Sequence, residues 1–377
     1  MNILFLHRWT GVRGGGTETH LKGLLKNFSS NKDHKIYLLT REGPKKELLE
    51  KDFSNVELFT VSRNLFENDN SYENPILLYP HTFIFMLKSF FKLVYLLKVK
   101  KIKVDIISIH FATEAIVAKA INYLFGIPFI FIYEGYTDLE ANVGRLANDR
   151  ISITHYISKR CQDKYGYYPD VIYIGDSNFP LISKERIEEK YDDSQKTVLT
   201  LTRLEPRKNL FTAVKAIDYI VNHKKRHDIK FVWGGTGILK EELLKSIKDH
   251  NLENHIEYLG YVHEDDIVRV YQDSHVYFLP TYEEGFGIVF VEAMKSGSVN
   301  VSTNKTASPE IIGDVGLLVD DAENYKGYAE CILQLVDDRD LWKQKALSGR
   351  ERAKEFTWEK LMPKYEEKYL KTSKSTT

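Results

Sequence analysis

The sequence predicts an α/β protein built from two doubly wound domains. Short apolar runs, each long enough for a buried strand, alternate with stretches that have the apolar spacing of amphipathic helices. This alternation is typical of a parallel sheet that helices cover on both faces. It occurs twice along the 377 residues, a length that fits two domains of ordinary size.

The first half of the chain opens with one strand and one amphipathic helix. The apolar run Ile3–Leu6 predicts a buried strand, and apolar residues at helical spacing from Leu21 to Phe28 predict a helix after it. A longer apolar segment, Phe83–Leu97, predicts a helix that packs on the sheet. Further strands are expected in this half at Ile36–Leu39, Val56–Val61, Asp105–His110, Pro128–Tyr133, Ile151–Thr154 and Val171–Ile174.

The second half repeats the pattern after a charged segment. Residues Ser183–Lys196 show no buried face of their own, so the boundary between the domains is expected there. Beyond this segment, strands are expected at Val198–Thr202, Ile229–Trp233, Ile256–Leu259, Val276–Leu279 and Val299–Ser302.

The composition excludes several classes of protein. Lys and Arg together number 53, as do Asp and Glu, so the net charge is zero, whereas a nucleic-acid-binding protein usually carries a basic excess. The two cysteines, Cys161 and Cys331, have no CxxC partner, which disfavours a zinc site and fits a reducing compartment. The opening apolar run does not have the form of a signal peptide, and no apolar stretch reaches the length of a transmembrane helix. We therefore expect a cytoplasmic protein that does not bind nucleic acid.

The neutral total hides a difference between the two halves. Residues 1–180 hold 23 basic and 19 acidic side chains, and the remainder has the opposite excess. Between Pro80 and Val104 there are six lysines and no acidic residue. Two interpretations of Phe83–Lys103 stay open. The segment is either a helix packed on the sheet with lysines at its edges, or a peripheral surface that contacts an anionic membrane. The two are compatible if only one face of the helix is buried.

The most informative segment is Pro280–Glu292, in which a strand end, a turn with Gly285 and Gly287, and the start of a helix follow one another. Free backbone N–H groups at such a helix start attract an anion such as a phosphate, and glycine lets the anion approach closely. Glu284 in the loop and Glu292 on the helix are placed to accept hydrogen bonds from sugar hydroxyls. An acidic loop beside a glycine turn, with no ligand, is the alternative that spacing alone leaves open.

This segment resembles the E-x7-E motif of the retaining GT-B glycosyltransferases of family 4, also called glycosyl transferases group 1. Other landmarks of that family follow in the same order, and the resemblance spans nearly the whole chain. They are Gly15-Gly16-Thr17-Glu18 for its N-terminal glycine loop, Arg203 to Lys208 for its basic loop, Gly235-Thr236-Gly237 for its GxG turn, Leu259–Val262 for the strand end beside the base, and Phe356-Thr357-Trp358 for the start of its closing helix.

The resemblance implies the GT-B fold, in which two Rossmann-like domains face a cleft and a C-terminal helix crosses back to the N-terminal domain. On this basis the acceptor-side domain is expected to comprise residues 1–185 together with the closing helix 358–377. The nucleotide-sugar-binding domain is expected to comprise residues 196–357.

The resemblance also implies roles for individual residues. Arg203 and Lys208 are expected to bind the diphosphate of the donor. Glu292 is expected to bind the ribose hydroxyls, and Glu284 the donor sugar. Backbone groups that contact the base are expected at Gly260, Tyr261 and Val262. Further donor-binding residues are expected at Gly15, Gly16, Gly235, Gly285, Phe286, Gly287, Ile288 and Val289.

His110 ends a predicted strand, and a lone histidine there has either a structural or a catalytic role. Ligands of open α/β sheets bind at the carboxyl ends of the strands, and the family places a histidine near the reacting carbon, so we expect His110 to line the reaction centre with Glu284. A histidine that many family members carry after the next strand is replaced here by Glu134-Gly135-Tyr136. Glu134 and Tyr136 are therefore candidates for acceptor binding, and Glu134 also for a general base.

The reaction implied by the resemblance is retaining transfer of a hexose from a nucleotide-diphosphate sugar to a hydroxyl of a glycan or lipid-linked acceptor. A UDP-sugar is slightly favoured over a GDP-sugar. No metal or other cofactor is expected, because cationic side chains and a helix dipole can stabilise the departing diphosphate.

Alternatives also remain. A nucleotide-sugar epimerase of the same architecture and a non-catalytic nucleotide-sugar-binding relative both stay open. A nicotinamide enzyme is disfavoured, because the glycine loop Gly14–Gly16 lacks the G-x-G-x-x-G spacing.

Overall fold

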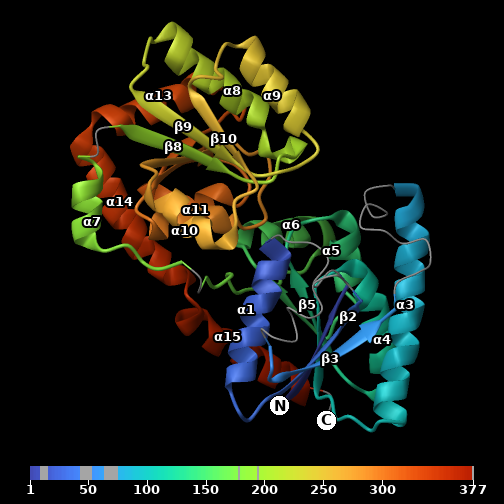
Figure 1. Ribbon diagram of the computed structural model, residues 1–377. Coiled ribbons are helices and arrows are strands. Elements are labelled where there is room, and N and C mark those ends of the chain that lie inside the picture. The colour runs from blue at the N-terminus through green and yellow to red at the C-terminus, as the bar shows by residue number, and fades with distance from the viewer. Residues whose placement is uncertain (9–15, 43–52, 63–74, 177–178, 193–194, 376–377) are drawn as a thin grey trace. The chain divides into compact units, whose positions relative to one another are not determined.

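The computed structural model describes residues 1–8, 16–42, 53–62, 75–176, 179–192 and 195–375, with no side-chain description for residues 75–80. The chain divides into two compact units (Figure 1). The first unit comprises Met1–Gly175 together with Trp358–Thr377, and the second comprises Asp176–Thr357.

The first unit is built on a parallel sheet. Its order among the described strands is β3-β2-β1-β4-β5-β6-β7, and the centre is fixed by the pairing of Leu4 with Tyr37 on one side and Ile107 on the other. The central strands are fully buried, as their continuous apolar runs predict. The strands are β1 (Asn2–His7), β2 (Lys35–Arg41), β3 (Val56–Val61), β4 (Ile106–Ile109), β5 (Phe129–Tyr133), β6 (Asp149–Ser152) and β7 (Asp170–Val171).

Helices cover both faces of this sheet. The first helix and the C-terminal helix pack together on one face, and two helices of the middle of the unit pack together on the other (Figure 1). The sidedness follows from the strand order, because right-handed crossovers to either side of β1 place their helices on opposite faces. The helices are α1 (Gly16–Ser30), α3 (Pro75–Lys98), α4 (Ala112–Phe125), α5 (Asp138–Gly144), α6 (His155–Tyr165) and α15 (Trp358–Lys374).

The second unit repeats this plan with the strand order β10-β9-β8-β11-β12-β13, again parallel. All the strands expected from the sequence form, and the structure adds β13, a short strand that the sequence analysis missed. The strands are β8 (Lys196–Leu201), β9 (Ile229–Gly234), β10 (Ile256–Gly260), β11 (Val276–Leu279), β12 (Val299–Thr303) and β13 (Leu317–Val319). The α-helices are α7 (Lys184–Lys190), α8 (Leu210–Asp218), α9 (Lys240–Asp249), α10 (Glu264–Gln272), α11 (Ile288–Lys295), α12 (Ser308–Ile312), α13 (Tyr325–Asp337) and α14 (Arg339–Ala353). Short turns of other helix types lie at η1 (Pro206–Lys208), η2 (Tyr219–His223), η3 (Gly313–Val315) and η4 (Lys354–Phe356).

In both sheets the strand order reverses between two central strands, β1 and β4 in the first unit and β8 and β11 in the second. The loops after such a pair diverge to opposite faces, so the carboxyl edge of the sheet is open to a ligand there. His110 follows β4 directly, Lys208 follows β8, and Glu284 follows β11. The fold therefore places the principal predicted residues at these two reversals.

The expected domain boundary at Ser183–Lys196 is corrected by the structure, which divides the chain earlier, between Gly175 and Asp176. The charged segment is not a linker. It forms α7, with the Ser183 hydroxyl accepting a hydrogen bond from the first turn, and then enters β8. Ile187 is buried, and the aliphatic stem of Lys190 is buried too while its Nζ donates to the backbone oxygen of Ser296 at 2.9 Å. The boundary prediction was wrong because the many charged residues of this segment made its buried face difficult to recognise.

The predicted return of the C-terminal helix to the first unit is confirmed. The fully buried indole of Trp358 begins α15 and fills a slot between two glycines of that unit. A Cβ added at Gly23 would lie 2.2 Å from the indole, and one added at Gly175 would lie 2.5 Å from it. The ring also stacks on His20, with the centroids 5.9 Å apart. These contacts depend on the absence of a side chain at both glycines.

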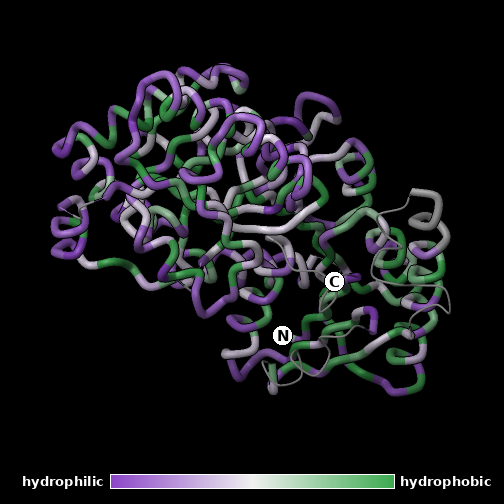
Figure 2. The backbone as a smooth tube through the Cα atoms, turned by 45° about the horizontal axis from the view of Figure 1, so that its top comes forward, coloured by the Kyte–Doolittle hydropathy of each residue, from purple (hydrophilic) through white to green (hydrophobic). Residues whose placement is uncertain are grey.

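The apolar helix at Phe83–Leu97 forms as part of the longer α3, and only one of its faces is buried. Phe85, Leu93 and Leu96 face the core, whereas a stripe at four-residue spacing is exposed, and much of the helix is hydrophobic along its length in Figure 2. The exposed stripe is Phe83, Leu87, Phe91, Tyr95 and Val99. Packing on the sheet through one face and contact with a membrane through the other are therefore compatible. Among the described residues, no helix is both long and apolar enough to span a bilayer.

Replacing Gly23 with Ala tests the packing of Trp358. We expect the free energy of unfolding to fall by about 1–3 kcal/mol, because the added methyl group must displace a buried ring or the helix that carries it. Chemical denaturation monitored by tryptophan fluorescence measures this change. Gly16→Ala on the same helix is the control, since nothing lies within 4 Å of a Cβ added there. Equal stability of the two variants would show that Trp358 does not hold α15 in place.

Candidate functional site

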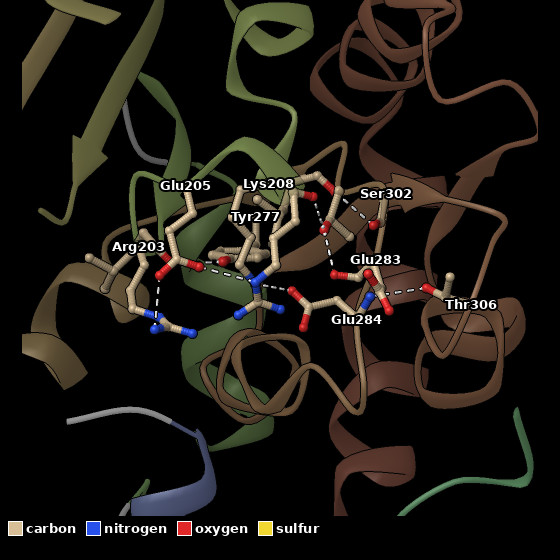
Figure 3. Close-up of polar contacts among 12 residues, drawn as sticks. Arg203, Glu205, Lys208, Tyr277, Glu283, Glu284, Ser302 and Thr306 are labelled. Carbon is tan, nitrogen blue, oxygen red and sulfur yellow. Dashed lines mark hydrogen bonds and ion pairs between the residues drawn. The ribbon is translucent and has the colours of Figure 1, made fainter. Parts of the chain in front are cut away.

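The loops after β8 and β11 meet at the carboxyl edge of the second sheet. The Lys208 ammonium forms an ion pair with the Glu284 carboxylate, and Figure 3 shows the two side chains pointing toward each other. Backbone contacts hold the loops together, because the N–H of Tyr282 and the hydroxyl of Thr281 both donate to the backbone oxygen of Arg207. The structure thus joins two residues that lie 76 positions apart in the sequence.

Both members of this ion pair are buried, each side chain being 7% exposed. Burial lowers the pKa of Lys208, while the negative charge of Glu284 acts in the opposite direction. A buried ammonium needs an anionic partner, since an unpaired buried charge is strongly unfavourable. Lys208 is therefore a cation fixed in position at the open edge of the sheet, where an anionic ligand would have a partner.

Arg203 lies on the same loop but in a different environment. Its side chain is about half exposed and pairs with Glu205 at 2.9 Å. Arg207 binds the other oxygen of the same carboxylate at 3.1 Å. Glu205 thus joins two arginines beside Lys208, as Figure 3 shows for Arg203. A guanidinium on the surface can leave such a pair for a ligand at little cost.

The position of Glu284 depends on a residue that the sequence analysis did not select. The backbone N–H of Glu284 donates to Oγ1 of Thr306, which belongs to the loop after β12, at 3.1 Å (Figure 3). Thr306 has a φ of 56°, a value uncommon for a β-branched residue. Thr306 thus combines an unfavourable backbone conformation with a hydrogen bond to the backbone of Glu284.

The glycine turn before α11 forms as predicted. Gly287 has a φ of 83° and directly precedes the helix, and a Cβ there would lie 2.5 Å from the ring of Phe290. Ile288 and Val289 form the first turn and are half-buried, so their backbone N–H groups lie at the helix start. Phe286, predicted to bind the donor, has its ring buried against Phe356 with the centroids 5.7 Å apart. Its side chain is therefore part of the core, and only its backbone is available to a ligand.

Glu292 lies on α11 and is partly buried. Its carboxylate accepts a hydrogen bond from the Tyr271 hydroxyl at 3.0 Å. Burial, together with the nearby Asp176 carboxylate, raises the pKa of Glu292 to about 7. Asp176 itself is neutralised by Lys295 at 2.9 Å. Glu292 is therefore a carboxylate that changes charge near neutral pH, a property that sequence spacing did not indicate.

The glycines predicted to contact the donor fall into two kinds. Gly235 packs against backbone, because a Cβ there would lie 1.8 Å from the backbone oxygen of Thr202, and its N–H donates to the oxygen of Gly260. Its small size serves the approach of neighbouring chain segments. Gly260 has a φ of 65° and open space where a Cβ would point. Of these two, Gly260 is the one that a ligand can approach.

A cavity of about 380 Å³ opens beside the predicted base-contacting segment. Tyr261, Val262 and His263 line one end of it, and Tyr261 is 64% exposed. The cavity continues between α10 and the sheet, past Lys230 and Glu257. Lys208, Glu284 and Glu292 do not line it, so the cavity adjoins the predicted base contacts but does not contain the predicted phosphate and sugar contacts.

A second group of titratable side chains lies at the reversal point of the first sheet. His110 and His20 are both fully buried, and both place Nδ1 against the same oxygen of Glu134, at 2.8 Å and 2.6 Å. His7, at the end of β1, lies edge-on to His110 with a centroid separation of 5.3 Å. The predicted residues His110 and Glu134 are thus brought together, but Glu134, only 9% exposed, points at histidines. This contact does not show the acceptor role expected for Glu134.

Two more predicted residues of the first unit, Tyr136 and Gly16, are among the described residues. Tyr136 donates its hydroxyl hydrogen to Asp138 at 2.9 Å, and its ring lies 4.2 Å from the guanidinium carbon of Arg160. Gly16 is exposed at the start of α1. Gly15 lies outside the described residues.

Sequence reasoning missed His7, His20 and Tyr365 as members of the first group. His7 ends β1 in the same manner as His110 ends β4, so the strand-end rule that selected one histidine would also have found the other. His20 lies inside a helix and Tyr365 lies 345 residues after it. Nothing in the local pattern of either residue indicates that they meet.

Comparison with known proteins agrees with this architecture. Residues 182–355, all within the second unit, match the family described as Glycosyl transferases group 1. O-antigen chain mannosyltransferase B of Escherichia coli is 32% identical over 162 residues, which cover 43% of this chain and 42% of that protein. The chain therefore matches less than half the length of this curated relative.

Solved structures match over the whole length. Sucrose-phosphate synthase of Thermosynechococcus elongatus superposes with a TM-score of 0.81 at 15% identity, covering 98% of each chain. HepE of Anabaena, solved in complex with UDP-glucose, superposes with a TM-score of 0.75 at 18% identity, covering 98% of this chain and all of that one. The second unit of this chain therefore resembles Glycosyl transferases group 1 domains, and the chain as a whole has the GT-B fold.

Proposed function

We propose that this protein is a glycosyltransferase that moves a hexose from a nucleotide-diphosphate sugar to a hydroxyl of a glycan or lipid-linked acceptor, with retention at the anomeric carbon. The observation that carries this proposal is the buried Lys208–Glu284 pair at the strand-order reversal of the second sheet. The family match to that unit and the UDP-glucose complex of HepE support it. The retaining outcome and membership of family 4 rest on the E-x7-E resemblance.

The proposed roles follow from charge. Lys208 and Arg203 bind the diphosphate, whose negative charge increases as the glycosidic bond to it breaks. Glu284 is then released from its pair with Lys208 to accept hydrogen bonds from the sugar hydroxyls. Glu292 binds the ribose hydroxyls, and the backbone at Gly260 contacts the base. A UDP-sugar is the donor that we favour, and we propose His110 as a further catalytic residue.

No metal enters this proposal. The two cations at 203 and 208 and the N-terminus of α11 supply the electrostatic stabilisation that a divalent ion supplies in other phosphoryl-leaving reactions. An epimerase would consume the donor without an acceptor, and a non-catalytic relative would bind the donor without turnover. Donor consumption is therefore measured with and without acceptor, in the presence of EDTA. Consumption that needs the acceptor indicates a transferase, consumption without it indicates an epimerase, and no consumption indicates a non-catalytic relative.

Replacing Lys208 with Met tests the diphosphate assignment. We expect donor turnover to fall roughly 100-fold or more, because the cation opposite the leaving group is lost. A thermal-shift panel of UDP, GDP and ADP sugars first identifies the donor, since stabilisation follows mass action. Turnover and the shift are then measured on the variant.

The loss of folding stability in this variant has to be separated from the loss of donor turnover. The Lys208→Met substitution would leave Glu284 buried and unpaired, at a cost of about 3–5 kcal/mol. We therefore expect the double variant Lys208→Met with Glu284→Gln to recover much of the stability but none of the turnover. Lys215→Ala, at an exposed position on α8, is the control. Near-normal turnover in a folded Lys208→Met protein would refute the assignment.

The raised pKa of Glu292 predicts how donor affinity depends on pH. Below pH 7 the Glu292 carboxyl of the unliganded protein is mostly protonated, whereas hydrogen bonds from ribose hydroxyls favour its ionised form. Binding must then release a proton, so we expect Kd for the nucleotide sugar to fall about tenfold between pH 6 and pH 8. Isothermal titration calorimetry measures this, and the diphosphate of a nucleotide sugar keeps its charge over that range.

Glu292→Gln should abolish this dependence, because the amide does not titrate. Glu253→Gln, at an exposed position of the same unit, should retain it. The same tenfold change in the Glu292→Gln protein would assign the titration to another group.

We further propose that the exposed stripe of α3 contacts an anionic membrane that carries the acceptor. Phe83 and Phe91 are 59% and 64% exposed, and Lys98, Lys100 and Lys101 are exposed at the C-terminal end of the helix. Exposed aromatic residues beside lysines suit the interface of an anionic bilayer. This proposal places the protein in the cytoplasm, on the inner face of the membrane.

Co-sedimentation with vesicles tests this surface. We expect binding to vesicles that contain phosphatidylglycerol and weaker binding to pure phosphatidylcholine. The double variant Phe83→Ser with Phe91→Ser should bind the anionic vesicles at least about tenfold more weakly, because it lacks the two rings that would insert into the bilayer. Phe211→Ser, an exposed phenylalanine of the second unit, is the matched control. Equal binding of the stripe and control variants would place the membrane contact elsewhere.

A further inference from the structure

Glu134 lies at the centre of a hydrogen-bond network built from three separate elements of the first unit. His20 comes from α1, His110 follows β4, and Glu134 follows β5. One oxygen of Glu134 lies 2.6 Å from Nδ1 of His20 and 2.8 Å from Nδ1 of His110. Both histidine side chains are fully buried, so water does not compete for these contacts.

The other nitrogen of His20 shows where its protons are. Nε2 lies 2.9 Å from the hydroxyl of Tyr365, which comes from α15. The same hydroxyl lies 3.1 Å from the backbone oxygen of Ile172 and 3.2 Å from that of Tyr173. Carbonyl oxygens only accept, so the single hydroxyl hydrogen of Tyr365 points to them, and Tyr365 accepts from Nε2–H of His20. With Nδ1–H donated to Glu134, His20 carries two protons and a positive charge.

The charge on His20 determines the state of Glu134. Burial acts to raise the pKa of Glu134, but the positive charge of His20 and the hydrogen bonds from both histidines outweigh it and lower the pKa to about 2. Glu134 is therefore an ionised carboxylate paired with one histidinium. A hydrogen bond between His110 and this carboxylate must then be donated by Nδ1–H of His110.

This assignment leaves Nε2 of His110 as the unprotonated nitrogen. Nε2 is buried and has no hydrogen-bond partner among the described residues. His7, packed edge-on to His110, stays neutral because burial lowers its pKa. The charged neighbour of His110 is His20, whose ring centroid lies 5.9 Å away, so a second charge on His110 would be unfavourable. The free lone pair is at the carboxyl end of β4, where ligands of such sheets bind.

The three side chains also lie close enough together to hold a metal ion. Their geometry favours protons instead. Each nitrogen lies at hydrogen-bond distance from one shared oxygen, whereas metal ligands surround an ion and bind it through unprotonated nitrogens. Tyr365 donates to backbone oxygens, so Nε2 of His20 is its hydrogen-bond donor and is not free to bind a metal.

We propose that Glu134 is a positioning residue that fixes His110 in its neutral Nδ1–H tautomer, so that Nε2 is presented as a hydrogen-bond acceptor for a hydroxyl of the substrate. His20, held by Tyr365, supplies the positive charge that keeps Glu134 ionised. The C-terminal helix thereby contributes to the site through Tyr365. The use of Nε2 toward a sugar or acceptor hydroxyl rests on the proposed glycosyltransferase function, whereas the tautomer does not.

Nitrogen NMR of the ¹⁵N-histidine-labelled protein tests the tautomer without any substrate. We expect His20 to show two protonated nitrogens and His110 to show a proton on Nδ1 and a free Nε2. In Glu134→Gln we expect His20 to become neutral and part of the His110 population to shift to the Nε2–H form, since the amide group can donate as well as accept. Single His20→Asn and His110→Asn variants assign the signals.

Kinetics on the same variants test the use of that nitrogen. We expect Glu134→Gln to lower kcat roughly 100-fold and to leave KM for the donor within about twofold, because the donor is bound mainly by the second unit. Tyr365→Phe, which removes only the hydroxyl, should lower kcat about tenfold. Glu359→Gln, at an exposed position on α15, should change neither quantity. Thermal melts confirm that each variant is folded.

The outcomes separate the two proposals. An Nε2–H tautomer of His110 in the wild-type protein, or tightly bound zinc whose removal by EDTA moves the imidazole signals, would overturn the positioning role. A normal kcat for a folded Glu134→Gln or Tyr365→Phe protein would overturn its catalytic relevance. The expected tautomers in a protein that turns over no nucleotide sugar would refute the glycosyltransferase proposal and leave the positioning role of Glu134 standing.

Discussion

Both halves of this protein depend on one constraint, a parallel sheet whose strand order reverses at its centre. Right-handed crossovers carry the chain to one face of the sheet before the reversal and to the other face after it. The loops that follow the two central strands therefore diverge and leave the carboxyl edge open between them. His7 and His110 occupy that edge in the first unit, and Lys208 and Glu284 occupy it in the second.

A buried charge at such an edge must have a partner, and the two units meet this need differently. In the second unit Lys208 pairs with Glu284, and both belong to loops at the open edge, so an anion can replace the carboxylate as the partner of the ammonium. In the first unit the charge pair of His20 and Glu134 is completed within the unit by Tyr365. The first arrangement suits ligand binding, and the second suits holding a neighbouring side chain, His110, in one protonation state.

Much of the second site was predictable because its residues obey local rules. A glycine turn before an apolar run predicts a helix start, and loops after parallel strands share one edge, so Gly287 and Glu284 could be placed from local rules, whereas Lys208 was selected through the family resemblance. Whether a predicted residue faces a ligand or the core was not predictable. Phe286 packs on Phe356, while Gly235 lies against the backbone of Thr202 and Gly260 faces open space.

The sequence by itself determined the class of fold, the positions of nearly all strands along the chain and the chemical character of the strand-end loops, because apolar runs and glycine turns act over a few residues. Only the tertiary structure decided that the charged segment 183–196 packs on the second unit, that α15 brings Tyr365 to His20, and that Glu134 turns inward to two histidines. These outcomes depend on contacts between residues up to 345 positions apart. Burial at such contacts sets protonation and charge, so the state of the first site is a property of packing and not of any local motif.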